Sequence, residues 1–197
     1  ETNVFQMYDF AVFLKENEKF NESKKYFTKV LNLIDKKHFL YPKAKDGRGV
    51  TFERLGNWEK AEKDFLDSLS VSPDQAYVIN YLAYSWIEKG MNIEKSMRML
   101  EKANKLKSND GYIIDSLGWA LFKLKKYEDA MKYLQIAVRI MPNDPVVNDH
   151  YGDSLWFNNK NIQARYYWNY VLNLEEAEEN LKASTRKKLI HGIQSKL

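Results

Sequence analysis

The three histidines are the side chains of this sequence best suited to metal or acid–base chemistry. His38, His150 and His191 lie far apart, and none has a second ligand at helical spacing, so no zinc site can be identified. His150, with Asp149 and Asp153 beside it, comes nearest to an acid–base cluster. A pH-sensitive contact is one interpretation of that cluster, and an interhelical hydrogen bond is the favoured one.

Nucleophiles and phosphate-binding loops do not stand out either. The sequence has no cysteine and no strand–turn–helix serine elbow. The string Lys-Asp-Gly-Arg-Gly at 45–49 lacks the Gly-Lys-Ser/Thr ending of a phosphate loop, and we expect it to lie inside a helix, where close packing explains Gly49. These patterns predict a protein that is not an enzyme, with no catalytic residues, cofactor or metal.

Composition limits the remaining classes. The 197 residues are 44% hydrophobic, with eight Gly, four Pro and a formal charge of +4, which excludes a disulfide scaffold and a disordered chain. No run of eighteen apolar residues could span a bilayer. Residue 1 is Glu, so we expect a piece of a longer chain whose targeting signal is lost from view, and the compartment, cytoplasm or periplasm, stays open.

A pattern of small and large residues returns about every 34 positions. Leu117, Gly118, Leu121, Tyr127 and Ala130 are followed by Leu134, Ala137 and Pro142. The same order returns around Ala83, around Gly49 and around Gly152, and more weakly near the N-terminus. Small residues at fixed places allow two helices to cross closely, and the prolines end the second helix of a pair. The period predicts an all-α superhelix of stacked antiparallel helix pairs.

This pattern resembles the tetratricopeptide repeat (TPR) over almost the whole chain. The resemblance implies one TPR solenoid domain over 1–197, a right-handed superhelix of about five repeats with a C-terminal capping helix at 179–196. The repeats are expected at 4–37, 42–75, 76–110, 111–144 and 145–176, with a longer connector at His38–Lys43 and one extra residue around Met91–Asn92. The strings at 80–86, 109–119 and 148–153 look more narrowly like those of alphaproteobacterial TPR repeat-containing proteins.

The resemblance implies a concave groove lined by the first helix of each repeat. The register places there Tyr77, Asn80, Tyr84, Tyr112, Asp115, Trp119, Phe122, Asp149, Asp153 and Trp156. The first two repeats contribute Phe5, Tyr8, Val12, Lys15, Lys43, Asp46, Val50 and Glu53. Tyr112 and Phe122 are expected to pack between helices, whereas Tyr84 and Trp119 are expected to be groove anchors. Asp110 and Asp144 are expected to cap helices.

The groove residues predict a non-enzymatic scaffold that binds a protein or peptide partner. In the third to fifth repeats, six aromatic residues and three aspartates without a lysine or arginine suit a segment with apolar side chains and basic residues. Two alternatives stay open: an RNA-binding helical repeat, although an acidic groove disfavours nucleic acid, and the non-catalytic part of a larger enzyme or assembly.

The N-terminal edge is apolar where an array normally has a polar cap. Phe5, Met7, Tyr8, Phe10 and Phe13 form this stretch. Either further repeats precede it, or it packs against another copy in a homo-dimer. The final helix, by contrast, alternates apolar and basic residues as a cap should, with apolar positions at Leu181, Leu189, Ile193 and Leu197.

Overall fold

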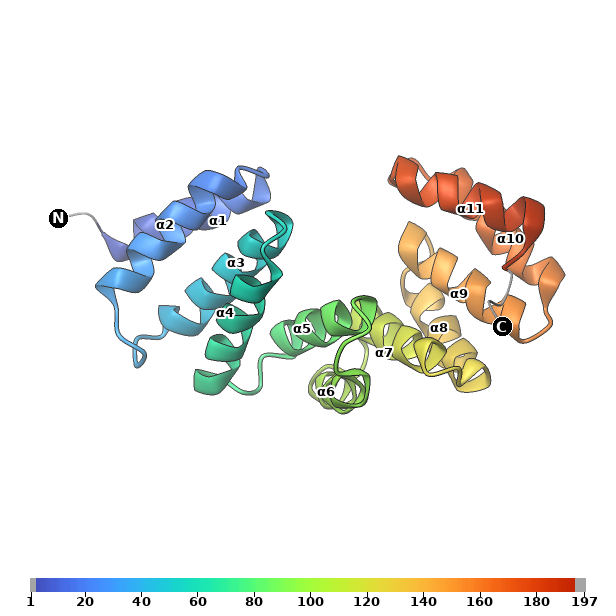
Figure 1. Ribbon diagram of the computed structural model, residues 1–197, viewed down its shortest axis with the longest axis horizontal. Helices are drawn as coiled ribbons and strands as arrows, with labels where there is room; N and C mark the ends of the chain where they lie inside the picture. The colour runs from blue at the N-terminus through green and yellow to red at the C-terminus, as the bar shows by residue number, and fades with distance from the viewer. Residues whose placement is uncertain (1–2, 194–197) are drawn as a thin grey trace. The chain divides into compact units, whose positions relative to one another are not determined.

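The computed structural model describes residues 3–193, and all the regular structure of that range is α-helical (Figure 1). The prediction of an all-α fold of helix pairs is confirmed. The helices are α1 (Val4–Glu16), α2 (Phe20–Leu33), α3 (Leu40–Arg54), α4 (Trp58–Val71), α5 (Ala76–Glu88), α6 (Ile93–Leu106), α7 (Gly111–Lys123), α8 (Tyr127–Ile140), α9 (Pro145–Phe157), α10 (Asn161–Leu172) and α11 (Glu179–His191).

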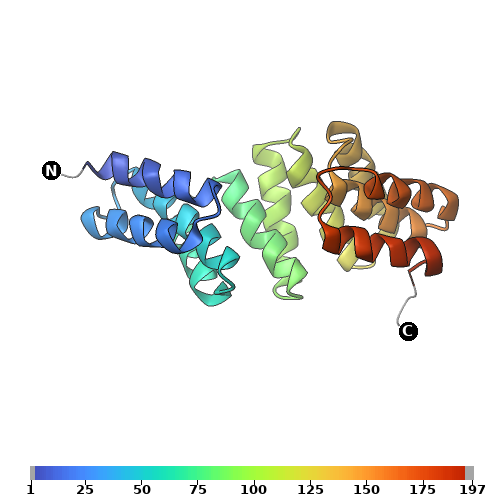
Figure 2. The same ribbon diagram turned by 90° about the horizontal axis from the view of Figure 1, so that it is seen from above.

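The chain forms two compact units, residues 1–82 and 83–197, with their boundary inside α5. Unit 1 contains α1 to α4 and the beginning of α5, and unit 2 contains the rest. Within each unit, helices that follow one another in the sequence pack side by side, as the antiparallel pair α1 and α2 shows in both views (Figures 1 and 2). That residues 1–197 act as one domain stays a prediction.

Short turns join the two helices of each pair. The turns after α1, α3, α7 and α9 have three residues, and the middle one has a positive φ in each: Glu18, Gly56, Lys125 and Asn159. The turn after α5 has four residues, with positive φ at Gly90 and Asn92, which confirms the extra residue predicted there. Each turn therefore reverses the chain through a left-handed residue.

Two predicted helix caps are confirmed, and one predicted connector lies at other residues than expected. The Asp110 and Asp144 carboxylates accept hydrogen bonds from the first-turn amides of α7 and α9, so their predicted capping role is confirmed. The longer connector predicted between the first two repeats is present, but it lies at residues 34–39 rather than at His38–Lys43, because α2 ends at Leu33 and α3 begins at Leu40. Pro42 lies in the first turn of α3, where its missing N–H has no intrahelical acceptor to lose.

The small residues mark close helix crossings, as predicted. A Cβ atom on Gly49 would lie 2.7 Å from the Phe65 ring, and one on Gly152 would lie 2.6 Å from the Trp168 ring. On Gly118 it would lie 2.7 Å from Leu134 Cγ and 3.2 Å from the Leu134 backbone nitrogen. The equivalent Ala83 is fully buried. These positions let α3, α7 and α9 approach α4, α8 and α10 closely.

The capping helix is shorter than predicted. It ends at His191, because Gly192 takes φ 68° and ψ −173°, a backbone conformation open essentially to glycine alone. Leu189 and Ile193 pack against the core of unit 2, as expected for a cap. The predicted contribution of Leu197 lies outside the described residues.

Candidate interaction surface

The groove positions of unit 2 come from α7, α9 and the last residues of α5, and α11 packs beside them. We call these four segments the first-helix layer of unit 2. Here Asp115, Asp149 and Asp153 are all buried. Their side chains therefore need partners from the chain itself, and they have them.

Asp115 is paired with His150. Both carboxylate oxygens lie 3.0–3.1 Å from His150 Nδ1, which confirms the interhelical hydrogen bond expected for that histidine. Burial alone would lower the pKa of His150, but the neighbouring carboxylates, Asp115 foremost, outweigh burial and hold the pKa above its ordinary value. The pair ties α9 to α7.

Asp149 and Asp153 share one lysine of α11. Lys188 Nζ lies 2.6 Å from Asp149 and 2.7 Å from the nearer oxygen of Asp153. Thr185 donates a second hydrogen bond to Asp149, and the Trp168 indole donates one to Asp153. Burial, together with the charge of Asp149, raises the pKa of Asp153 to about 6. The Asp149 and Asp153 carboxylates are thus bound by side chains of α11 and α10. They do not form an exposed acidic surface for a partner.

Trp119 is not an exposed anchor. Only 8% of its surface is exposed, because its ring stacks on the rings of His150 and Phe122. Its ring centroid lies 3.9 Å from that of His150 and 4.7 Å from that of Phe122. Its indole nitrogen donates to Glu88 of α5. The expectation of an exposed ring is wrong: a tryptophan on this face covers the buried His150–Asp115 pair rather than facing solvent.

The other aromatic groove positions divide between packing and exposure. Phe122 is half-buried against the rings of Tyr127 and Phe157, as expected. Tyr112, expected to pack between helices, is instead 59% exposed. Tyr84 is half-buried, and burial and the charge of Glu88 raise the pKa of its hydroxyl. Trp156 is half-buried beside Trp168 and donates to the Ile193 carbonyl.

Unit 1 holds the two remaining groove positions and a separate carboxylate. Tyr77 is exposed, and the Asn80 Oδ1 atom is buried without a hydrogen-bond partner among the described residues. Asp46 of α3 is partly buried, and within residues 3–193 its carboxylate makes no ion pair; burial raises its pKa to about 6, opposed by the charge of Lys15. The neighbouring Glu53 accepts a hydrogen bond from Tyr81.

Sequence reasoning missed Glu88 and Lys188. Glu88 lies four positions beyond Tyr84, the last groove position named for α5, and it keeps 44% of its side chain exposed. Lys188 is one of the basic residues of the final helix, which the sequence predicts to be a cap. The signal that could have found it is the spacing of Thr185 and Lys188, which puts both on one face of α11 and opposite an acidic α9.

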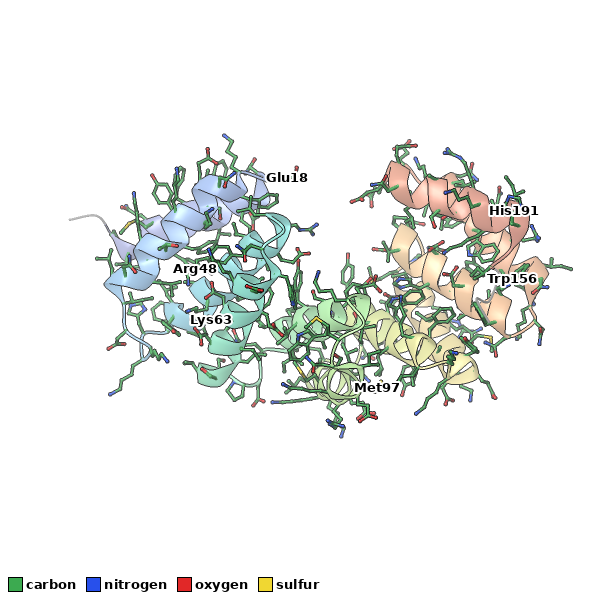
Figure 3. All side chains as sticks on the ribbon, in the orientation of Figure 1. Glu18, Arg48, Lys63, Met97, Trp156 and His191 are labelled. Carbon is green, nitrogen blue, oxygen red and sulfur yellow. The ribbon has the colours of Figure 1, made fainter. Side chains whose placement is uncertain are left out.

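A cavity of about 770 Å³ opens between α11 and the C-terminal ends of α7 and α9. It is lined by Phe122, Asp153, Phe157, Ser184, Lys187, Lys188, His191, Gly192 and Ile193. In Figure 3, Trp156 and His191 label the ends of α9 and α11 that border this region. The cavity thus combines an aromatic floor from α7 and α9 with polar side chains from α11.

Residues 3–193 contain neither a cluster suited to a metal ion nor a helix that could span a membrane. No group of three or more His, Cys, Asp or Glu side chains in residues 3–193 is arranged to hold a metal ion. None of the helices in that range is both long and apolar enough to cross a bilayer.

Two curated relatives are TPR repeat-containing proteins. PA4667 of Pseudomonas aeruginosa is 30% identical over 106 residues, which cover 54% of this chain and 18% of that protein. MJ1428 of Methanocaldococcus jannaschii is 23% identical over 183 residues, which cover 90% of this chain and 30% of that protein. The chain therefore spans less than a third of either relative. The narrower likeness to alphaproteobacterial proteins stays a prediction.

Solved TPR structures share the fold. PilW, a type IV pilus biogenesis factor, superposes with a TM-score of 0.78 at 17% identity over 96% of this chain and 87% of that chain. YrrB, described as a TPR protein with an unusual peptide-binding site, gives 0.66 at 14% identity over 94% and 92%. Such identities establish the fold alone.

A family model described as tetratricopeptide repeat matches residues 20–177. Proteins built from this repeat are generally scaffolds for protein–protein interactions. Because the match covers most of the sequence and the helix pairs agree with it, this chain belongs to the tetratricopeptide repeat family.

Proposed function

We propose that this chain is a non-enzymatic interaction module that binds a partner segment on the first-helix layer of unit 2. The supporting observation is the division of that layer into a fixed interior and an open surface. The interior is tied together by the His150–Asp115 and Lys188–Asp149–Asp153 contacts. A surface supported in this way holds its outer side chains in place before a partner arrives, which reduces the entropy lost on binding.

The open surface supplies aromatic anchors and one carboxylate. Tyr112 is exposed, while Tyr84 and Phe122 each keep part of a ring accessible. Tyrosine and phenylalanine are enriched at interfaces because they bury a large area with little loss of side-chain freedom. Glu88, four residues after Tyr84 on α5, keeps 44% of its side chain exposed, and Lys123 lies 3.6 Å from its carboxylate. An apolar segment with a basic residue fits this surface.

The basic residue of the partner is assigned to Glu88 rather than to the three aspartates. Asp115 is buried and already bound by His150, and Asp149 and Asp153 are buried and already bound by Lys188. A partner lysine that reached them would have to displace Lys188 or His150. Glu88 requires no such displacement, since its carboxylate is already exposed to solvent.

The test is panning of a displayed library of random twelve-residue peptides against the chain. Selected peptides should be apolar with at least one Lys or Arg, and Tyr112→Ala and Glu88→Lys should each weaken their binding by about fivefold or more. Tyr166→Ala is the matched control, because Tyr166 of α10 is a similarly exposed tyrosine on a second helix. Selected peptides that bind both Tyr variants equally would contradict the proposed surface.

A further inference from the structure

The cavity beside α11 has a recognisable chemistry. Its floor is apolar, made by Phe122 and Phe157, whose rings meet edge to face at 5.3 Å, and by Ile193. It is open to solvent on one side, and its volume of about 770 Å³ is large enough to receive a side chain from that side. The floor can therefore cover a large apolar side chain.

The wall of the cavity comes from one stripe of α11. Ser184, Lys187, Lys188 and His191 follow at spacings of three, four and seven residues, which puts them on the same helix face. This stripe contains two lysines, a histidine and a hydroxyl group, and no acid.

The positive charge of this stripe is only partly compensated. Asp153 is the one carboxylate of the lining, and it accepts hydrogen bonds from Lys188 and from the Trp168 indole. Lys188 in turn is held by Asp149. Lys187 and His191, by contrast, make no ion pair within residues 3–193 and are exposed. The cavity therefore has a fixed inner charge pair and an unpaired cation at its rim.

We infer that this cavity receives a large apolar side chain of the partner together with an adjacent carboxylate. The apolar group lies on the Phe122–Phe157 floor, and the carboxylate meets the Lys187 ammonium and the Ser184 hydroxyl group. This inference rests on the proposed function and adds an acidic group to the partner, beside the basic residue that Glu88 receives. Charge complementarity argues for it, because Lys187 has no ion-pair partner within residues 3–193 and its ammonium can attract a carboxylate held beside the aromatic floor.

The probe is N-acetyl-phenylalanine, with N-acetyl-phenylalanine amide as its uncharged match. Both are titrated into the ¹⁵N-labelled chain, and amide shifts are followed at the cavity, including Gly192 and Ile193. The acid should bind about three- to fivefold more tightly than the amide, and this preference should shrink as salt is raised. Equal affinity of the two probes, or shifts confined to other helices, would overturn the inference.

Two neighbouring variants locate the charge. Lys187→Gln should remove the preference for the acid, whereas Arg186→Gln should keep it, because Arg186 is an equally charged neighbour outside the cavity lining. The same loss in both variants would mean general attraction to a basic helix and would overturn the site. Peptides that need Tyr112 but show no dependence on Lys187 would refute this inference and leave the proposed function intact. Peptides that depend on Lys187 but not on Tyr112 would refute the proposed function at the Tyr112 surface and leave the cavity as a site.

Discussion

At the residue scale, glycine is required where two helix backbones meet. At Gly118 the obstacle to any side chain is partly backbone, since the Leu134 nitrogen would lie 3.2 Å from a Cβ atom. At Gly111 the nearest atoms belong to the flexible Met141 side chain. A change from Gly to Ala brings a gain in helix propensity at both positions, but of the two only Gly118 has a backbone atom in the way. Comparing the two substitutions therefore separates the packing cost from helix propensity.

We predict that Gly118→Ala destabilises the chain by about 1–2 kcal/mol. The gain in helix propensity, about 0.5–1 kcal/mol, is smaller than the overpacking cost of about 1–3 kcal/mol. Gly111→Ala should lose less, because Met141 can move. Urea unfolding of both variants measures the difference, and a Gly118→Ala variant as stable as the parent would contradict the close crossing.

Asp46 is a second residue whose environment has a measurable consequence. Burial raises its pKa to about 6 in the folded chain, above the ordinary value of 3.8. The folded state therefore holds this proton more tightly than the unfolded state does. Stability from this group is present at low pH and falls as pH rises from about 4 through 6.

We predict that Asp46→Asn raises the free energy of unfolding at pH 7 by about 1–2 kcal/mol and leaves it nearly unchanged at pH 4. The variant removes a partly buried carboxylate that has no ion-pair partner among the described residues. Urea unfolding at the two pH values tests this, with Asp9→Asn on the same unit as a control for net charge. A loss of stability at pH 7 would show that the carboxylate has a stabilising partner.

At the element scale, α11 is held by buried charge as well as by apolar contact. Lys188 and Thr185 bind α9, while Leu189 and Ile193 pack against the core of unit 2. Trp156 fills the space at the end of the helix, where it contacts Gly192. The capping helix therefore supplies the ion-pair partner of Asp149 and Asp153 and also one wall of the cavity.

We predict that Lys188→Met destabilises unit 2 by about 3–5 kcal/mol, since it leaves Asp149 and Asp153 buried without their cation. Lys187→Met, next to it and exposed, should change stability by less than about 0.5 kcal/mol. Hydrogen exchange of the α11 and α9 amides should rise in the first variant only. Similar exchange in both variants would mean that apolar packing alone holds the helix.

At the scale of the whole molecule, the contacts within each unit run mainly between helices adjacent in sequence. In unit 1, Phe5, Phe10 and Phe13 of α1 are exposed. A surface of this kind fits either of the two predictions, further repeats before α1 or contact with another copy. The homo-dimer through the N-terminal edge stays a prediction.

We predict that the chain self-associates through these phenylalanines as its concentration rises. Sedimentation velocity over a concentration range should show a growing fraction of dimer, and Phe13→Glu should abolish it because a charge is buried in the contact. Ile162→Glu is the control, since Ile162 of α10 is more exposed than Phe13 and lies in unit 2. A monomer at every concentration would contradict self-association.

The sequence alone determined the helix pairs, their register and the small residues at the crossings. The 34-residue period follows from contacts within each helix pair, because every pair needs a small residue at the same close crossing. Gly49, Gly118 and Gly152 could therefore be assigned to crossings from the sequence. The register also placed the groove positions on the first helices, although it could not decide their exposure.

Only the tertiary structure decided which groove residues are open. Trp119, Asp115 and Asp153 share a register with Tyr84 and Tyr112, yet the first three are buried. The difference comes from side chains distant in sequence: His150 bonds Asp115 and stacks on Trp119, and Lys188 reaches Asp153 across 35 residues. Burial and pairing depend on such neighbours, which no repeat period within one helix pair specifies.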